Sequence, residues 1–100
     1  MKMQPEQLQI FVAVARCGSF TAAAKQLYIS HSTTSRAISA LEDELGVRLF
    51  YRGNRVNGLT APGETLLEEA VKLLDAAEAA KKRVRAAAER EKKNTGEKET

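Results

Sequence analysis

The sequence predicts a mainly α-helical protein in which three helices and a two-stranded wing precede one long helix. Apolar residues recur at helical spacing in three early segments, each closed by a turn. Two brief apolar runs on either side of Gly53 and Asn54 predict a β-hairpin, because both residues tolerate the positive φ of a tight connection. A strict 4-3 apolar repeat from Leu66 to Ala87 then predicts the long helix.

The first two helices are short and are bounded by recognisable start and stop residues. The first is predicted over residues 5–16, with Pro5 in its first turn and Gly18 beyond its end. Its apolar face consists of Leu8, Phe11, Val12 and Ala15. The second begins after Ser19 as N-cap, and the turn at residues 28–29 follows it without a glycine. Its inner face consists of Phe20, Ala23, Ala24 and Leu27, whose alanines allow another helix to cross closely.

The third helix is predicted over residues 32–45, capped by Ser30 and ended by Gly46. One face suits a core and consists of Thr34, Ala37, Ile38, Leu41 and Leu45. The other face is short and polar and consists of Ser32, Thr33, Ser35, Arg36 and Ser39. The acidic residues lie in the last turns, at positions 42–44, where they would repel phosphate. The N-terminal half is therefore the part that can enter a groove of DNA.

A hairpin and a long helix complete the chain. The strands are predicted over Leu49–Arg52 and around 56–59, with Arg52 and Arg55 flanking the tip. Thr60 is the expected N-cap of the long helix, which has Pro62 in its first turn. Its apolar seam consists of Leu66, Ala70, Leu73, Ala77, Ala80, Val84 and Ala87. A rod of this length has more apolar surface than a small core can cover, so we expect a second copy to pair with the seam. The alternative is a single solvated helix.

These elements divide the chain into a winged helix-turn-helix over residues 1–60, a dimerising linker helix over 61–90 and a charged, disordered tail over 91–100. The net charge of +3 is unevenly distributed. Residues 1–60 carry seven Lys or Arg against four acids, a difference of +3, whereas residues 61–100 carry nine of each. The positive excess thus coincides with the candidate motif, as contact with phosphate requires.

Composition argues against other classes of protein. No apolar run approaches the ~20 residues of a membrane span, and polar residues interrupt the N-terminus where a secretory signal would be apolar. The single cysteine, Cys17, cannot form an intramolecular disulfide and is expected at the edge of the core, so a cytoplasmic protein is expected. One histidine, no cysteine pair and no glycine-rich phosphate loop give no support for a metal site, a cofactor or an enzyme.

Over Gln7 to Leu67 the chain resembles the N-terminal DNA-binding domain of LysR-type transcriptional regulators. The matching positions are Leu8 and Phe11, Gly18-Ser19-Phe20, Ala23-Ala24, Leu27, Ser30, Ser35-Arg36, Ile38, Leu41-Glu42, Leu45-Gly46, Leu49-Phe50, Arg52, Arg55, Leu59-Thr60 and Gly63. The resemblance implies a winged helix-turn-helix that dimerises through a linker helix and controls prokaryotic transcription at interrupted palindromes. The family usually has Gln-Pro where this chain has His31-Ser32, which implies an atypical target sequence. Family members normally continue into an effector-binding domain, so neither that domain nor a small-molecule effector is expected within these 100 residues.

The candidate DNA-binding residues are His31, Ser32, Thr33, Ser35, Arg36, Ser39, Arg52 and Arg55. Arg36 has the planar fork that binds guanine bidentately, although it could instead pair with Glu42 or Asp43. His31 could donate to a guanine or a phosphate, or simply cap the turn. The basic residues of the wing could reach the minor groove or its phosphates, and a salt bridge beneath the wing is the alternative for Arg52. Lys25 and Gln26 are secondary candidates for backbone contact.

The sequence therefore predicts a sequence-specific regulator that binds double-stranded DNA as a homodimer. Two other functions stay open. The chain could be a short interaction module that forms heterodimers with full-length regulators through the linker helix. It could also be an architectural binder without sequence preference.

Overall fold

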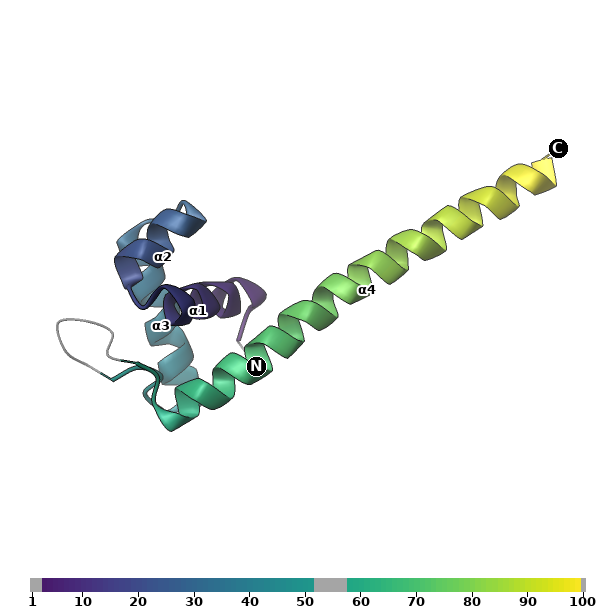
Figure 1. Cartoon of the computed structure of the whole chain (residues 1–100). Helices are drawn as coiled ribbons and strands as arrows, with labels where there is room; N and C mark the ends of the chain where they lie inside the picture. Colours follow the sequence, from purple (N-terminus) through teal and green to yellow (C-terminus); the bar gives the residue numbers. More distant parts are fainter. Residues whose placement is uncertain (1–2, 52–57, 100) are drawn as a thin grey trace.

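The computed structural model describes residues 3–51 and 58–99, with side chains as far as Lys93. In these residues four α-helices follow one another: α1 over Pro5–Cys17, α2 over Phe20–Leu27, α3 over His31–Leu45 and α4 over Ala61–Glu99. The first three gather into a head from which α4 projects as a straight rod (Figure 1). The molecule accordingly measures 67 × 25 × 20 Å. No helix in the described part of the chain has the length and apolarity to cross a membrane.

Helix α1 occupies the centre of the head and packs against α2, α3 and α4. Every residue from Ile10 to Val14 is buried, and so is Leu8. The sequence pattern predicts only one apolar face, and the additional burial of Ile10, Ala13 and Val14 shows that neighbours cover more of α1 than this face, although Gln9 and Arg16 stay exposed. A helix that contacts three others through most of its surface is the element around which a small core is built.

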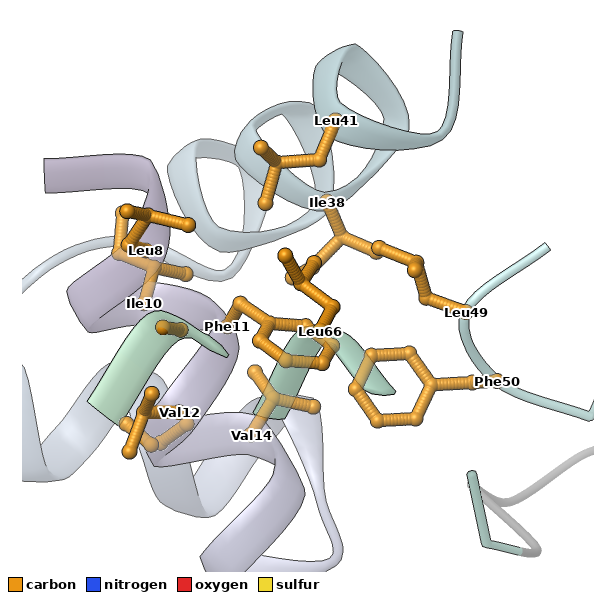
Figure 2. Close-up of a cluster of buried hydrophobic side chains, with 13 residues drawn as sticks. Leu8, Ile10, Phe11, Val12, Val14, Ile38, Leu41, Leu49, Phe50 and Leu66 are labelled. Carbon is orange, nitrogen blue, oxygen red and sulfur yellow. The ribbon is translucent and has the colours of Figure 1, made fainter. Parts of the chain in front are cut away.

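The core joins segments that are far apart in the sequence. Figure 2 shows Phe11 and Val14 of α1 beside Leu66 of α4, with Ile38 and Leu41 contributed by α3. Phe50, which follows α3, lies with its ring centroid 5.5 Å from that of Phe11. Aromatic pairs at this separation stabilise a core beyond the area they bury. The cluster therefore attaches both the segment leading into the hairpin and the start of α4 to the central helix.

The predicted caps are confirmed. The Ser19 hydroxyl oxygen accepts a hydrogen bond from the Ala22 N–H at 3.2 Å, and the Ser30 hydroxyl oxygen accepts one from the Thr33 N–H at 3.0 Å. Gly18 and Gly46, each with φ of 68°, close α1 and α3 in the left-handed conformation that glycine adopts readily. These residues set the lengths of the head helices, whose observed bounds differ from the predicted ones by at most one residue.

The described part of the hairpin is short. One antiparallel bridge pairs Phe50 with Leu59. It is flanked by hydrogen bonds from the Tyr51 N–H to the Gly58 carbonyl, 3.1 Å, and from the Thr60 N–H to the Leu49 carbonyl, 3.0 Å. The remainder of the predicted strands, with Arg52, Arg55 and residues 53–57, lies outside the described residues. The base of the wing is therefore observed, and its tip stays a prediction.

Helix α4 begins as predicted, since the Thr60 hydroxyl oxygen accepts a hydrogen bond from the Gly63 N–H at 3.0 Å. It continues through residues 91–99, where the sequence predicts a disordered tail. This part is rich in Glu and Lys, which are good helix formers, and extending an existing helix costs little compared with starting one. The division of the chain at residues 60 and 90 otherwise stays a prediction.

Two expectations about buried faces need correction. Leu66 and Ala70 were expected in a seam available to a second copy, but α1 of the same chain packs on this part of α4 and both residues are buried. Leu45 was expected in the core, yet 39% of its surface is exposed. It is the last residue of α3, and the chain turns away immediately at Gly46.

Gly63 marks the point where α4 approaches the segment after α3. A Cβ atom at this position would collide with the Leu49 carbonyl, so only glycine fits without a backbone shift.

Gly63→Ala should therefore lower the free energy of unfolding by about 1–3 kcal/mol, the usual cost of forcing an atom into a closed site. Urea denaturation followed by circular dichroism measures this change. Glu64→Ala, at the exposed neighbouring position, is the control and should alter stability by less than about 0.5 kcal/mol. Equal stability of the two variants would contradict the close approach.

Candidate nucleic-acid interface

Helices α2 and α3 form a helix-turn-helix joined by three residues. The Tyr28 N–H caps α2 by donating to the carbonyls of Ala24 and Lys25, and the Ile29 N–H donates to the Ala24 carbonyl at 3.0 Å. Ser30 then caps α3. Both helices pack against α1 and against each other, so the turn holds α3 at a defined angle to the rest of the head.

The polar face of α3 is exposed as expected. Ser32, Arg36 and Ser39 recur at i, i+4 and i+7 and point to solvent, and Thr33 beside them is also exposed. Ser35 is half-buried. The first turn of the helix holds no acidic residue, and the three carboxylates of α3 all follow position 41. The N-terminal half of α3 therefore presents hydroxyls and one cation without competing negative charge.

Arg36 forms no ion pair with any described residue. The alternative pairing with Glu42 does not occur, because Glu42 turns inward and pairs with Arg48, whose Nη1 lies 3.6 Å from Glu42 Oε1. The guanidinium is consequently available to an external acceptor.

His31 and Thr33 are oriented by neighbours within the head. The His31 imidazole is exposed and lies edge-on to Phe20, with 6.0 Å between the ring centroids. The Thr33 hydroxyl oxygen accepts a hydrogen bond from Ser30 Oγ at 2.9 Å and keeps its own hydrogen for another acceptor. Gln26, a secondary candidate, accepts a hydrogen bond from the Cys17 thiol at 3.1 Å. That contact links α1 to α2 and places the half-buried Cys17 at the edge of the core, as expected.

Glu42 is a supporting residue that sequence reasoning missed. It is buried, and its Oε2 accepts a hydrogen bond at 2.9 Å from the backbone N–H of Leu49. The Thr60 hydroxyl donates at 2.6 Å to the carbonyl of Arg48, the residue before Leu49. These bonds hold the backbone that leads into the hairpin. The helical period could have predicted the burial of Glu42, because position 42 follows Ile38 by four residues and so lies on the apolar face of the helix.

A shallow polar depression of about 400 Å³ lies at the other end of α3. It is lined by Ser39, Glu42, Asp43, Gly46, Val47 and Arg48. Its two carboxylates make it a poor place for phosphate, and no group of three metal-binding side chains occurs in the described residues. The feature of α3 that suits a nucleic acid is therefore the acid-free first half.

The five seam residues beyond Ala70 are exposed: Leu73, Ala77, Ala80, Val84 and Ala87. The two large apolar residues among them are well exposed, since 50% of the surface of Leu73 and 69% of that of Val84 face solvent. Arg52 and Arg55 lie outside the described residues, so the structure does not place them relative to α3.

Comparison with known proteins identifies this arrangement. Residues 5–64 match the model of a family described as "Bacterial regulatory helix-turn-helix protein, lysR family". The chain belongs to the LysR family. It is therefore a domain of a DNA-binding transcriptional regulator and not an enzyme.

Individual members of the LysR family support the assignment. The chain is 48% identical over 85 residues to the HTH-type transcriptional regulator ClcR of Pseudomonas putida, a match that covers 85% of this chain and 29% of ClcR. The chain thus spans less than a third of this relative. Its fold matches that of CbnR_DBD in a crystal structure with DNA, with a TM-score of 0.82 and 44% identity over 85% of this chain and 98% of that one. BenM_DBD in a complex with catB site 1 DNA gives a TM-score of 0.81 at 36% identity, covering 85% and 94% of the two chains.

The role of Glu42 leads to a stability prediction. Glu42→Ala leaves the buried Leu49 N–H without its acceptor, which should cost about 1–3 kcal/mol of folding free energy. Glu42→Gln keeps an oxygen acceptor for the Leu49 N–H while it removes the charge that pairs with the exposed Arg48, so it should cost less than Glu42→Ala. Denaturant titration of both variants beside Asp43→Ala, an exposed neighbour, measures the difference. Equal effects of the alanine and glutamine variants would argue against the hydrogen bond to Leu49.

Proposed function

We propose that this chain binds double-stranded DNA in a sequence-specific manner as a homodimer, at an interrupted palindrome, and thereby regulates transcription. The observation that carries the proposal is the exposed, acid-free N-terminal half of α3 with Arg36 at its centre, whose guanidinium forms no ion pair within the part of the chain that the structure describes. The two similar DNA-binding domains named above are described in complexes with DNA, which supports the same role for α3 here.

The residues of α3 have different proposed roles in DNA recognition, according to their side-chain chemistry. Arg36 reads a guanine, because its fork matches the O6 and N7 acceptors on the edge of that base in the major groove. Ser32, Thr33, Ser35 and Ser39 have short side chains that let the helix approach closely and bond to phosphates or bases. His31, at the start of the helix, donates to a base or a phosphate. Arg52 and Arg55 of the wing complete the proposed interface at the adjacent backbone.

Dimerisation is proposed through the exposed part of α4. Its seam keeps 4-3 spacing over Leu73, Ala77, Ala80, Val84 and Ala87, and its alanines permit a close helix–helix approach. With 39 residues the helix is about 58 Å long, so much of it lies beyond the head. Among residues 3–51 and 58–99, no other helix packs on the seam in that part.

The charges of α4 favour antiparallel pairing of two copies. Residues 64–78 carry five acids and one lysine, a net charge of −4, whereas residues 81–93 carry seven bases and two acids, a net charge of +5. These charged side chains are exposed. An antiparallel pair places the acidic segment of each helix beside the basic segment of the other, while a parallel pair would align like charges. A two-fold dimer of this kind presents two copies of α3 to a palindrome.

Selection of binding sites from random duplex DNA at about 150 mM salt tests the proposal, since this ionic strength already screens charges beyond ~8 Å. We expect an enriched palindrome with a guanine in each half-site. Retention of DNA without an enriched sequence would favour an architectural binder. Absence of retention, together with heterodimer formation on mixing with a full-length relative, would favour an interaction module.

Arg36→Ala should weaken binding to the selected site by about 5- to 150-fold per half-site and relax selectivity at one base pair, in line with the ~1–3 kcal/mol of a bidentate contact. Titration against the selected site and a guanine-substituted site measures both effects. Arg16→Ala, which removes the same charge from an exposed position on α1, is the matched control and should retain selectivity. Unchanged base preference in the Arg36 variant would contradict its role in reading DNA.

Leu73→Glu should dissociate the dimer and weaken DNA binding without altering α3, because it places a charge in the apolar seam. Sedimentation and DNA titration on the same samples check this. Ala86→Glu adds the same charge on the opposite side of α4 and should leave the dimer intact. If the Leu73 variant were monomeric and bound DNA as tightly as the wild type, dimerisation through α4 would not be needed.

A further inference from the structure

Tyr28 is an unusual residue at the turn between α2 and α3. Its φ of 58° makes it the only non-glycine residue with a positive φ in residues 3–51 and 58–99. Its side chain is 95% exposed, so the phenol ring makes almost no contact within the chain. A large aromatic side chain in this backbone conformation is strained, and here no packing compensates for the strain.

The other head helices show what this position would normally hold. Helices α1 and α3 end at Gly18 and Gly46 with φ of 68°, nearly the conformation of Tyr28 at the end of α2. Glycine serves both of those ends without strain. The backbone of Tyr28 caps α2, but any residue with an N–H provides that bond. The fold therefore needs the turn at position 28 and does not need the tyrosine side chain.

The location of Tyr28 suggests a partner for its hydroxyl. It stands two residues before the N-cap Ser30, directly beside the end of α3 that carries the acid-free polar face. When that end enters a major groove, the flanking turn lies at the rim of the groove, where the phosphates are. Lys25, three residues before Tyr28 on α2, is also exposed and adds positive charge on this side of the turn. Tyrosine hydroxyls are regular donors to DNA phosphates.

We propose that the Tyr28 hydroxyl donates a hydrogen bond to a DNA phosphate at the rim of the groove and so positions α3 against the bases. The inference rests on the proposed DNA binding and adds a positioning residue to it. Because the phenol is neutral, its contact contributes affinity without releasing a counterion. Because phosphates are the same at every base pair, it contributes equally on all sequences.

Tyr28→Phe tests the hydroxyl alone. We expect binding to the selected duplex to weaken by about tenfold or more, which corresponds to one hydrogen bond to a charged group. The loss should be equal on a base-substituted duplex, and the slope of log affinity against log salt should match that of the wild type. Arg36→Ala in the same assay should instead change base selectivity. The comparison therefore distinguishes a contact that positions α3 from a contact that recognises a base.

Tyr28→Gly separates DNA contact from a purely structural role. Glycine relieves the positive φ, so the melting temperature should equal or exceed that of the wild type, while DNA affinity falls at least as far as in Tyr28→Phe. A loss of DNA affinity without a loss of melting temperature supports the inference. Wild-type affinity in Tyr28→Phe, or a loss of affinity matched by a loss of thermal stability in both variants, would overturn it. Failure of the wild type to bind any duplex would instead remove the proposed function itself, together with this contact.

Discussion

Helix α1 packs against α2, α3 and α4 at once, and the positions of all three depend on it. Burial of Phe11 and Val14 supplies the apolar surface on which α3, Phe50 and Leu66 meet (Figure 2). A domain of this size has no second core to compensate for a defect. Removal of apolar volume from α1 would therefore loosen the helix-turn-helix and the root of α4 together.

This arrangement assigns one surface of each outer helix to the core and leaves another surface available. Helix α3 uses Ile38 and Leu41 for packing, which leaves its serine- and arginine-bearing face to solvent. Helix α4 uses its first turns for packing and projects the remaining seam away from the head (Figure 1). The surfaces proposed for DNA and for a second copy are thus separated along the molecule, so each can be altered without disturbing the other.

The accuracy of sequence reasoning differed with the range of the interaction. Ser19 and Ser30 were predicted as caps because each bonds to a backbone N–H three residues away, and such contacts follow from local spacing. The contact of Glu42 was not predicted, because its bond to Leu49 involves a segment after the end of α3. Leu66 and Ala70 fit the heptad repeat as well as Leu73 does, and only the packing of α1 on this part of α4 distinguishes them.

By itself, the sequence determined the order and bounds of the head helices, the caps, the two faces of α3 and the family, because periodicity and capping act within one or two turns. The tertiary structure decided which apolar residues are buried within the chain and which stay exposed. It also showed that Glu42 faces inward and that Tyr28 holds a strained conformation with its ring in solvent. A residue is buried only where another element packs over it, and in this protein that element comes from a distant part of the sequence.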